Sequence, residues 1–160
     1  MKQCTLKDSF VVKGKGLHTG LEIEATFKPA PDNYGRRFKR LDIEGSEPVE
    51  AVAENVVDTQ RGTVIASGDV KVCTIEHAMA ALFAAGVDNC LVELTGPEVP
   101  ILDGSSKIFT EKIAETGVVE QSEEALVYAV RQRTVLKDDN TGASICAIPD
   151  SDFCVDVRIE

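Results

Sequence analysis

Two adjacent residues, Glu76 and His77, could do chemistry at the start of an apolar helix spanning residues 74–85. In metal-assisted hydrolysis an imidazole can hold the metal while a carboxylate takes a proton from the attacking water. The positive end of the helix dipole would favour the ionised form of Glu76. The alternative is that the two side chains are solvated or structural on a helix surface. Without further evidence, the dipeptide favours this alternative. The chain has only two histidines, His18 and His77, whereas a catalytic zinc ion normally takes three protein ligands plus water. A zinc site would therefore be incomplete in these residues.

Three further residues have types that could support such a site. His18 lies in a glycine-flanked turn, where it could line a cleft or bind a ligand; spacing alone favours a histidine hydrogen-bonded to backbone. Asp103 lies in a constrained loop before a second helix, where it could orient an imidazole or bind substrate; pattern alone favours capping of that helix. Cys73 could be a metal ligand, but packing beneath the helix is the favoured interpretation.

The elements that would position these residues follow from hydrophobic periodicity. Thr74 is a plausible N-cap of the first helix, and Gly86 suits a left-handed stop after it. A buried stripe of this helix is predicted at Ala78, Ala81, Leu82 and Ala85. The second helix is predicted at residues 107–116 and ends at Gly117. Strands are predicted at residues 5–14, 21–27, 36–43, 61–65 and 89–94, with a hairpin turn at 67–69.

The last part of the chain has a different pattern. Residues 121–124 are polar and acidic, and they are the best linker candidate. Strands are expected at 126–135 and 144–148, with a hairpin loop at 138–142, and a further alternating strand at 153–159. A segment of strands without a helix has little to bury its apolar face against. We therefore expect it to open a second domain that is cut short or differently made.

Composition restricts the function classes. The 160 residues carry a net charge of −10, which argues against a nucleic-acid binder. A cationic run at residues 36–40 could meet a small anion, but a solvated strand is the favoured interpretation. There is no secretory leader and no apolar run of about 20 residues, so a cytoplasmic protein that does not span a membrane is expected. The five cysteines form no Cys-x-x-Cys pair, which predicts free, mostly buried thiols.

Four segments together resemble one family. They are Gly16-Leu17-His18-Thr19-Gly20, then Thr74-Ile75-Glu76-His77 with Ala80-Ala81-Leu82, then Gly86-Val87-Asp88-Asn89, and Pro100-Ile101-Leu102-Asp103-Gly104-Ser105. In this order and spacing the chain, from Thr5 to about Ile159, is similar to the UDP-3-O-acyl-N-acetylglucosamine deacetylases, zinc-dependent enzymes of lipid A synthesis in Gram-negative bacteria.

The resemblance implies an α+β fold in which a mixed, mostly antiparallel sheet packs on two helices, as one half of a two-domain sandwich. Residues 1–122 would be the complete first domain, and residues 123–160 the first strands of a second, similar domain. The implied reaction hydrolyses the N-acetyl group of UDP-3-O-acyl-N-acetylglucosamine to acetate and a free amine. The resemblance makes His77 a zinc ligand and Glu76 the general base on zinc-bound water, with His18 and Asp103 in supporting roles.

The resemblance also implies that parts of the site are missing. The family's other zinc ligands, in a His-Lys-x-x-x-Asp helix and at a later His, belong to the second domain, and no histidine follows His77. We therefore expect an amino-terminal fragment with an incomplete zinc site, inactive alone, that could self-associate through the face the missing domain would cover. Two alternatives remain: a non-catalytic nucleotide-sugar-binding or regulatory module, and an unrelated α+β structural protein.

Overall fold

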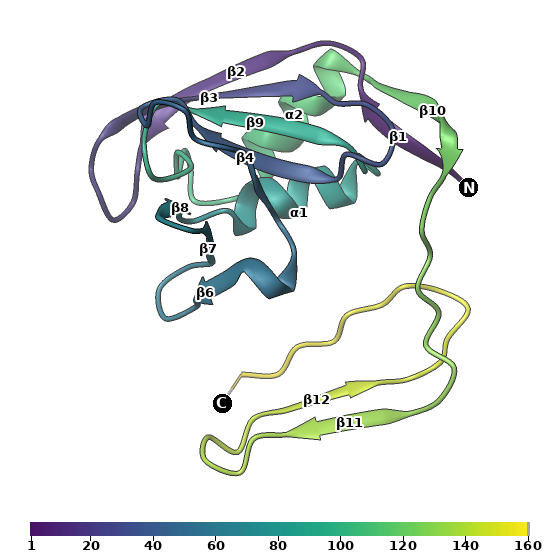
Figure 1. The fold of residues 1–160 in the computed structure, drawn as a ribbon. Coiled ribbons are helices and arrows are strands. Elements are labelled where there is room, and N and C mark those ends of the chain that lie inside the picture. Colours follow the sequence, from purple (N-terminus) through teal and green to yellow (C-terminus); the bar gives the residue numbers. More distant parts are fainter. Residues whose placement is uncertain (160) are drawn as a thin grey trace. The chain divides into compact units, whose positions relative to one another are not determined.

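A computed structural model describes residues 1–159, and the chain divides into two units, Met1–Ala125 and Leu126–Glu160. Unit 1 is α+β (Figure 1). Its strands are β1 (Lys2–Leu6), β2 (Phe10–Lys15), β3 (Glu22–Pro29), β4 (Arg36–Arg40), β5 (Val49–Glu50), β6 (Val56–Asp58), β7 (Val64–Ser67), β8 (Val70–Val72), β9 (Cys90–Leu94) and β10 (Val118–Glu124). Its helices are the 3-10 turn η1 (Ala53–Asn55), α1 (Glu76–Ala84) and α2 (Lys107–Thr116).

The main sheet has five strands in the order β2-β3-β9-β4-β5. Only the β4–β9 pair is parallel, so the sheet is mixed and mostly antiparallel, as expected. Both helices lie against one face of this sheet (Figure 1). A separate antiparallel sheet, β6-β7-β8, precedes α1, and its β7–β8 turn falls at residues 68–69, within the predicted hairpin.

The core lies between the sheet and the helices. Alternate residues of β3 are buried, with Phe27 fully enclosed. Its ring stacks on Phe10 of β2 at 4.6 Å between centroids and meets Phe109 of α2 at 5.8 Å. On α1 the buried residues are Ala78, Ala81 and Leu82, three of the four predicted. Alternation on the strands and helical spacing on α1 and α2 therefore converge on one core.

The predicted carboxyl-terminal ends of the helices are confirmed, whereas the predicted N-cap of α1 is not. α2 has the predicted bounds, and Gly86 and Gly117 have positive φ values of 68° and 88°. The predicted N-cap is wrong: Ile75 occupies that position without a side-chain cap. Thr74 instead has φ 58°, and its hydroxyl donates to Glu98. The Thr74 hydroxyl therefore bonds to a residue distant in sequence, Glu98, instead of capping α1.

One strand prediction and the linker prediction also need correction. The predicted strand at residues 5–14 is interrupted at residues 7–9, and its two parts belong to β1 and β2, which lie in different sheets. The linker predicted at residues 121–124 is instead the end of β10, paired antiparallel with β1.

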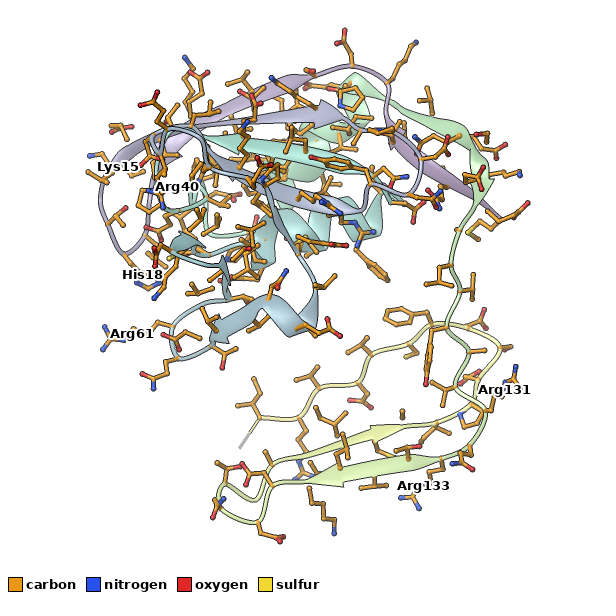
Figure 2. The ribbon with its side chains drawn as sticks, in the orientation of Figure 1. Lys15, His18, Arg40, Arg61, Arg131 and Arg133 are labelled. Atoms are coloured by element: carbon orange, nitrogen blue, oxygen red, sulfur yellow. The ribbon has the colours of Figure 1, made fainter. Side chains whose placement is uncertain are left out.

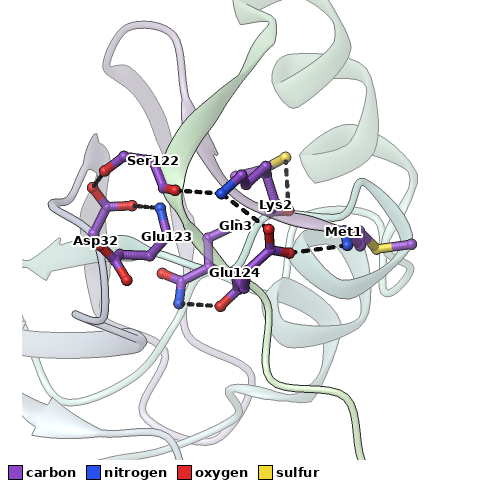
Figure 3. A network of polar contacts seen from close by, with 8 residues as sticks. Met1, Lys2, Gln3, Asp32, Ser122, Glu123 and Glu124 are labelled. Carbon is purple, nitrogen blue, oxygen red and sulfur yellow. Dashed lines mark hydrogen bonds and ion pairs between the residues drawn. The ribbon is translucent and has the colours of Figure 1, made fainter.

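Polar contacts explain why a polar, acidic sequence remains ordered there. Figure 3 shows Glu124 accepting from the amino group of Met1 and pairing with Lys2 at 3.0 Å, while Asp32 accepts from the Ser122 hydroxyl. Charge complementarity with the amino terminus stabilises a strand whose composition is typical of a linker.

Within residues 126–159, unit 2 contains one antiparallel hairpin, β11 (Thr134–Lys137) with β12 (Ser144–Ala147), and its loop includes the predicted residues 138–142. The strand predicted at 153–159 is wrong, because those residues have no regular secondary structure. A two-stranded hairpin leaves alternating apolar residues without a third strand to pair with. The domain limits 1–122 and 123–160 stay a prediction.

The cysteines are free, as predicted, but they are not mostly buried. Cys90 is buried, and burial raises its pKa to about 12. Cys146 and Cys154 in unit 2 are exposed. Cys4 and Cys73 are half-buried, and burial is the main cause that raises the pKa of each thiol.

These differences predict selective labelling of the native chain. A thiol-reactive disulfide reagent at pH 8 should modify Cys146 and Cys154 first, because a reactive thiol must be both accessible and deprotonated. Cys90 should react only in denaturant, where all five thiols become available. Peptide mass spectrometry assigns the sites; labelling of Cys90 as fast as Cys154 in the native chain would contradict the burial described here.

Candidate functional site

Glu76 and His77 are the first two residues of α1, so both belong to its first turn. Both are half-buried. The Oε2 atom of Glu76 accepts a hydrogen bond from the Thr63 amide at 2.9 Å. In residues 1–159 no hydrogen bond or ion pair engages the side chain of His77, which leaves its ring nitrogens available to a ligand.

His18 is exposed in the turn between β2 and β3. Its Nε2 lies 2.8 Å from the carbonyl oxygen of Arg61, and Figure 2 shows the two residues at the same end of unit 1. A carbonyl oxygen can only accept, so Nε2 carries the proton. The Nδ1 atom is then the nitrogen left to face solvent or substrate. The backbone hydrogen bond predicted for this histidine is confirmed.

A short loop brings His18 and Glu76 to one place. In this loop, between β6 and β7, the carbonyl oxygen of Arg61 accepts a hydrogen bond from the His18 ring, and the amide of Thr63 donates one to the Glu76 carboxylate. Gly62 between them has φ 147°, and a Cβ atom there would lie 3.2 Å from Oε1 of Glu76. The close approach of this loop to the carboxylate explains the glycine.

Glu98 is the residue of this region that the sequence did not single out. Its side chain is 0% exposed. Its carboxylate accepts from the amides of His18 (3.1 Å) and Thr19 (3.0 Å) and from the hydroxyls of Thr19 and Thr74, both at 2.9 Å. Burial alone would raise the pKa of this carboxyl group, but these hydrogen bonds outweigh burial, and the pKa lies below its usual value.

An apolar groove of about 340 Å³ runs beside Glu76. Its apolar lining comes from η1, β6, β7 and α1, and includes Val52, Val56, Ile65 and Met79, while Thr63 and Glu76 supply polar atoms. The Glu76 carboxylate therefore stands at the boundary between an apolar wall and solvent.

In residues 1–159 neither Asp103 nor Cys73 forms a hydrogen bond or ion pair with Glu76 or His77. Asp103 is exposed, and its Oδ1 accepts from the amide (3.0 Å) and hydroxyl (2.9 Å) of Ser105, which lower the pKa of its carboxyl group. The predicted helix-capping role is wrong, because α2 has Ser106 at its N-cap and no side-chain cap. Cys73 pairs through its backbone with the segment carrying Glu98.

The donor set fits one side of a zinc site. Imidazole and carboxylate are zinc ligand types, and the His77 ring is not engaged elsewhere in the described part of the chain. Within residues 1–159, however, no three His, Cys, Asp or Glu side chains gather closely enough to hold a metal ion. The chain offers one imidazole ligand beside a carboxylate and would need further ligands from outside the described residues.

The three arginines of the cationic run at residues 36–40 are engaged by other parts of the protein. Arg36 donates to the Val87 carbonyl, Arg37 pairs with Glu50 at 3.3 Å, and Arg40 pairs with Asp42 at 2.6 Å. Phe38 between them is fully buried. These contacts favour the structural interpretation of the run over anion binding.

The fold and the site together define an α+β domain that carries an acid–imidazole pair at the start of a helix. The sequence profile of the UDP-3-O-acyl N-acetylglycosamine deacetylase family, LpxC, matches residues 3–160, and the chain belongs to this family. No helix in residues 1–159 has the length and apolar character to cross a membrane.

Curated relatives include proteins named bifunctional enzyme LpxC/FabZ. That of Bacteroides thetaiotaomicron is 49% identical over 159 residues, 99% of this chain and 34% of the relative. That of Porphyromonas gingivalis is 50% identical over 158 residues, again 99% and 34%. The UDP-3-O-acyl-N-acetylglucosamine deacetylase of Cellvibrio japonicus is 39% identical over 160 residues, 100% of this chain and 52% of the relative. The chain thus spans between a third and a half of the length of these relatives.

The turn that carries His18 depends on the absence of a side chain at Gly16. A Cβ atom there would collide with Oε2 of Glu98 and Oγ1 of Thr19. We expect Gly16→Ala to lower the free energy of unfolding by about 2 kcal/mol, as overpacking does. Leu17→Ala, at an exposed position of the same turn, should cost less than about 0.5 kcal/mol. Urea unfolding measures both, and equal effects would contradict this account of the turn.

Proposed function

We propose that this chain supplies the general base and one zinc ligand of a UDP-3-O-acyl-N-acetylglucosamine deacetylase acting in lipid A synthesis in the cytoplasm. The observation that supports this most strongly is the pairing at the start of α1. The Glu76 carboxylate accepts the Thr63 amide at 2.9 Å, and its neighbour His77 has a ring that the described residues leave unengaged. Family membership makes amide hydrolysis the chemistry to expect of such a pair.

Glu76 is assigned the general base. The Thr63 amide holds Oε2 in place, and a carboxylate positioned in this way can accept the proton of the attacking water. Only Oε2 is engaged by that amide, which leaves Oε1 for the water. Glu76 would then hold the proton close to the amide nitrogen that leaves as the free amine, with acetate as the other product.

His77 is assigned to zinc, together with ligands from outside the described residues. Bound zinc acts as a Lewis acid that polarises the substrate carbonyl and makes water acidic enough to lose a proton near neutral pH. The chain by itself would bind zinc weakly, because a lone imidazole competes poorly at neutral pH, and it would lack turnover.

His18 is assigned a supporting role. With Nε2 donating to Arg61, its Nδ1 can contact substrate from the opposite side of the loop that holds Glu76. Asp103 is proposed as a second supporting residue on family resemblance alone, since its carboxylate is occupied by Ser105.

Substitutions of the pair test this function in the deacetylase that carries this chain. Glu76→Gln should retain zinc and lower kcat at least about hundredfold, the scale of a lost general base. His77→Ala should reduce zinc content measured by plasma mass spectrometry and abolish turnover. Glu111→Gln, at an exposed position of α2, is the matched control and should leave kcat and zinc content unchanged.

Two results would contradict the assignment: Glu76→Gln with wild-type kcat, or His77→Ala with full zinc occupancy. Binding of the nucleotide sugar without any acetate release by the wild-type deacetylase would instead favour a binding module.

A further inference from the structure

We propose that Glu98 is a positioning residue: its buried carboxylate joins the His18 turn to the segment preceding Glu76 and His77, so that both sides of the site are held as one rigid wall. This inference rests on the proposed function for its catalytic meaning. Its structural content, the joining of two segments, stands on the contacts of Glu98 alone.

The Glu98 carboxylate is divided between two segments that are far apart in sequence. Oε2 accepts from the amide and hydroxyl of Thr19, at 3.0 and 2.9 Å, in the turn between β2 and β3. Oε1 accepts from the hydroxyl of Thr74 at 2.9 Å, just before α1. The His18 amide lies 3.1 and 3.2 Å from the two oxygens. One side chain therefore fixes the spacing between the turn and the helix start.

From these contacts the constraint extends to Glu76 by two routes. Thr74 lies two residues before Glu76 and has φ 58°, an unfavourable conformation for a β-branched residue that the bond to Glu98 helps to hold. On the other route, the His18 ring binds the Arg61 carbonyl, and Thr63 of the same loop binds Glu76. Within residues 1–159 no hydrogen bond or ion pair joins Glu98 to Glu76 or His77, so Glu98 acts through these neighbours.

A role in packing alone does not explain a carboxylate at this position. In the described residues no ion pair involves Glu98, and it is fully buried. Burying a charge is costly, and an apolar side chain of similar volume often stabilises a core as well or better. What an apolar side chain cannot do is accept four hydrogen bonds in fixed directions from two segments.

Glu98→Gln tests the proposal because it keeps the size of the side chain and replaces one acceptor oxygen with a donor NH₂ group. Amide hydrogen exchange of the 160-residue chain, followed by NMR, is the first readout. We expect protection of the His18, Thr19 and Thr63 amides to fall about tenfold or more, the effect of losing a hydrogen bond to a charged acceptor. Amides of the paired strands β3 and β9 should keep their protection, and Glu111→Gln should change none of these amides.

The second readout is the kinetics of the deacetylase that carries this chain. Glu98→Gln should lower kcat about tenfold with KM within about twofold, because the base is misplaced while most substrate contacts remain. If the wild-type protein deacetylates nothing, the proposed function fails, and the exchange experiment still decides the positioning role.

Two exchange patterns would overturn the proposal. Loss of protection confined to His18 and Thr19, with Thr63 unchanged, would make Glu98 a brace of the turn only. An equal loss across β3 and β9 would make it a contributor to global stability. If Glu98→Gln does not fold, Thr74→Val removes one donor while keeping a β-branched side chain. It should then lower protection at Thr63 more than in β9, and an unchanged Thr63 amide would overturn the proposal.

Discussion

A single buried carboxylate sets the geometry on which the candidate site depends. Glu98 is buried without a cationic partner in the described residues, and its carboxylate accepts hydrogen bonds from His18, Thr19 and Thr74. Hydrogen bonds to a charged acceptor are strong and directional, especially away from water. They bind the turn after β2 to the residues before α1. His18 lies in that turn, and Glu76 and His77 begin the helix that follows Thr74.

The fold brings these segments within reach of Glu98. The antiparallel β2–β3 pair carries the turn at one end of the sheet, and the stacked rings of Phe10 and Phe27 fix that pair against α2. The segment after β9 returns along Cys73, where backbone hydrogen bonds hold it beside the start of α1. The sheet and the helices thus provide a rigid support, while the site itself is built from the loops between them, as is common in enzymes.

Sequence patterns predicted the elements better than the contacts between them. α2 and the end of α1 followed from helical spacing and from Gly86 and Gly117, because these signals are local. The N-cap at Thr74 and the cap by Asp103 failed because tertiary or neighbouring partners took the side chains. The composition of residues 121–124 is typical of a linker, and a short sequence window does not reveal their charge complementarity with Met1 and Lys2. Glu98 was missed for the same reason, since an isolated Glu in a loop is ordinarily exposed; its position between Pro97 and Pro100, beside Val99, was the one available hint.

In the proposed function the chain forms one wall of a hydrolytic site, where Glu76 and His77 would face a zinc ion whose other ligands lie outside the described residues. The most direct test is a crystal structure of the zinc-loaded deacetylase that carries this chain, with anomalous data at the zinc edge. The account predicts a His77 ring nitrogen about 2.1 Å from zinc, and the Glu76 carboxylate within hydrogen-bond reach of the open coordination position. A zinc ion bound entirely by other residues, with His77 directed away from it, would contradict the account.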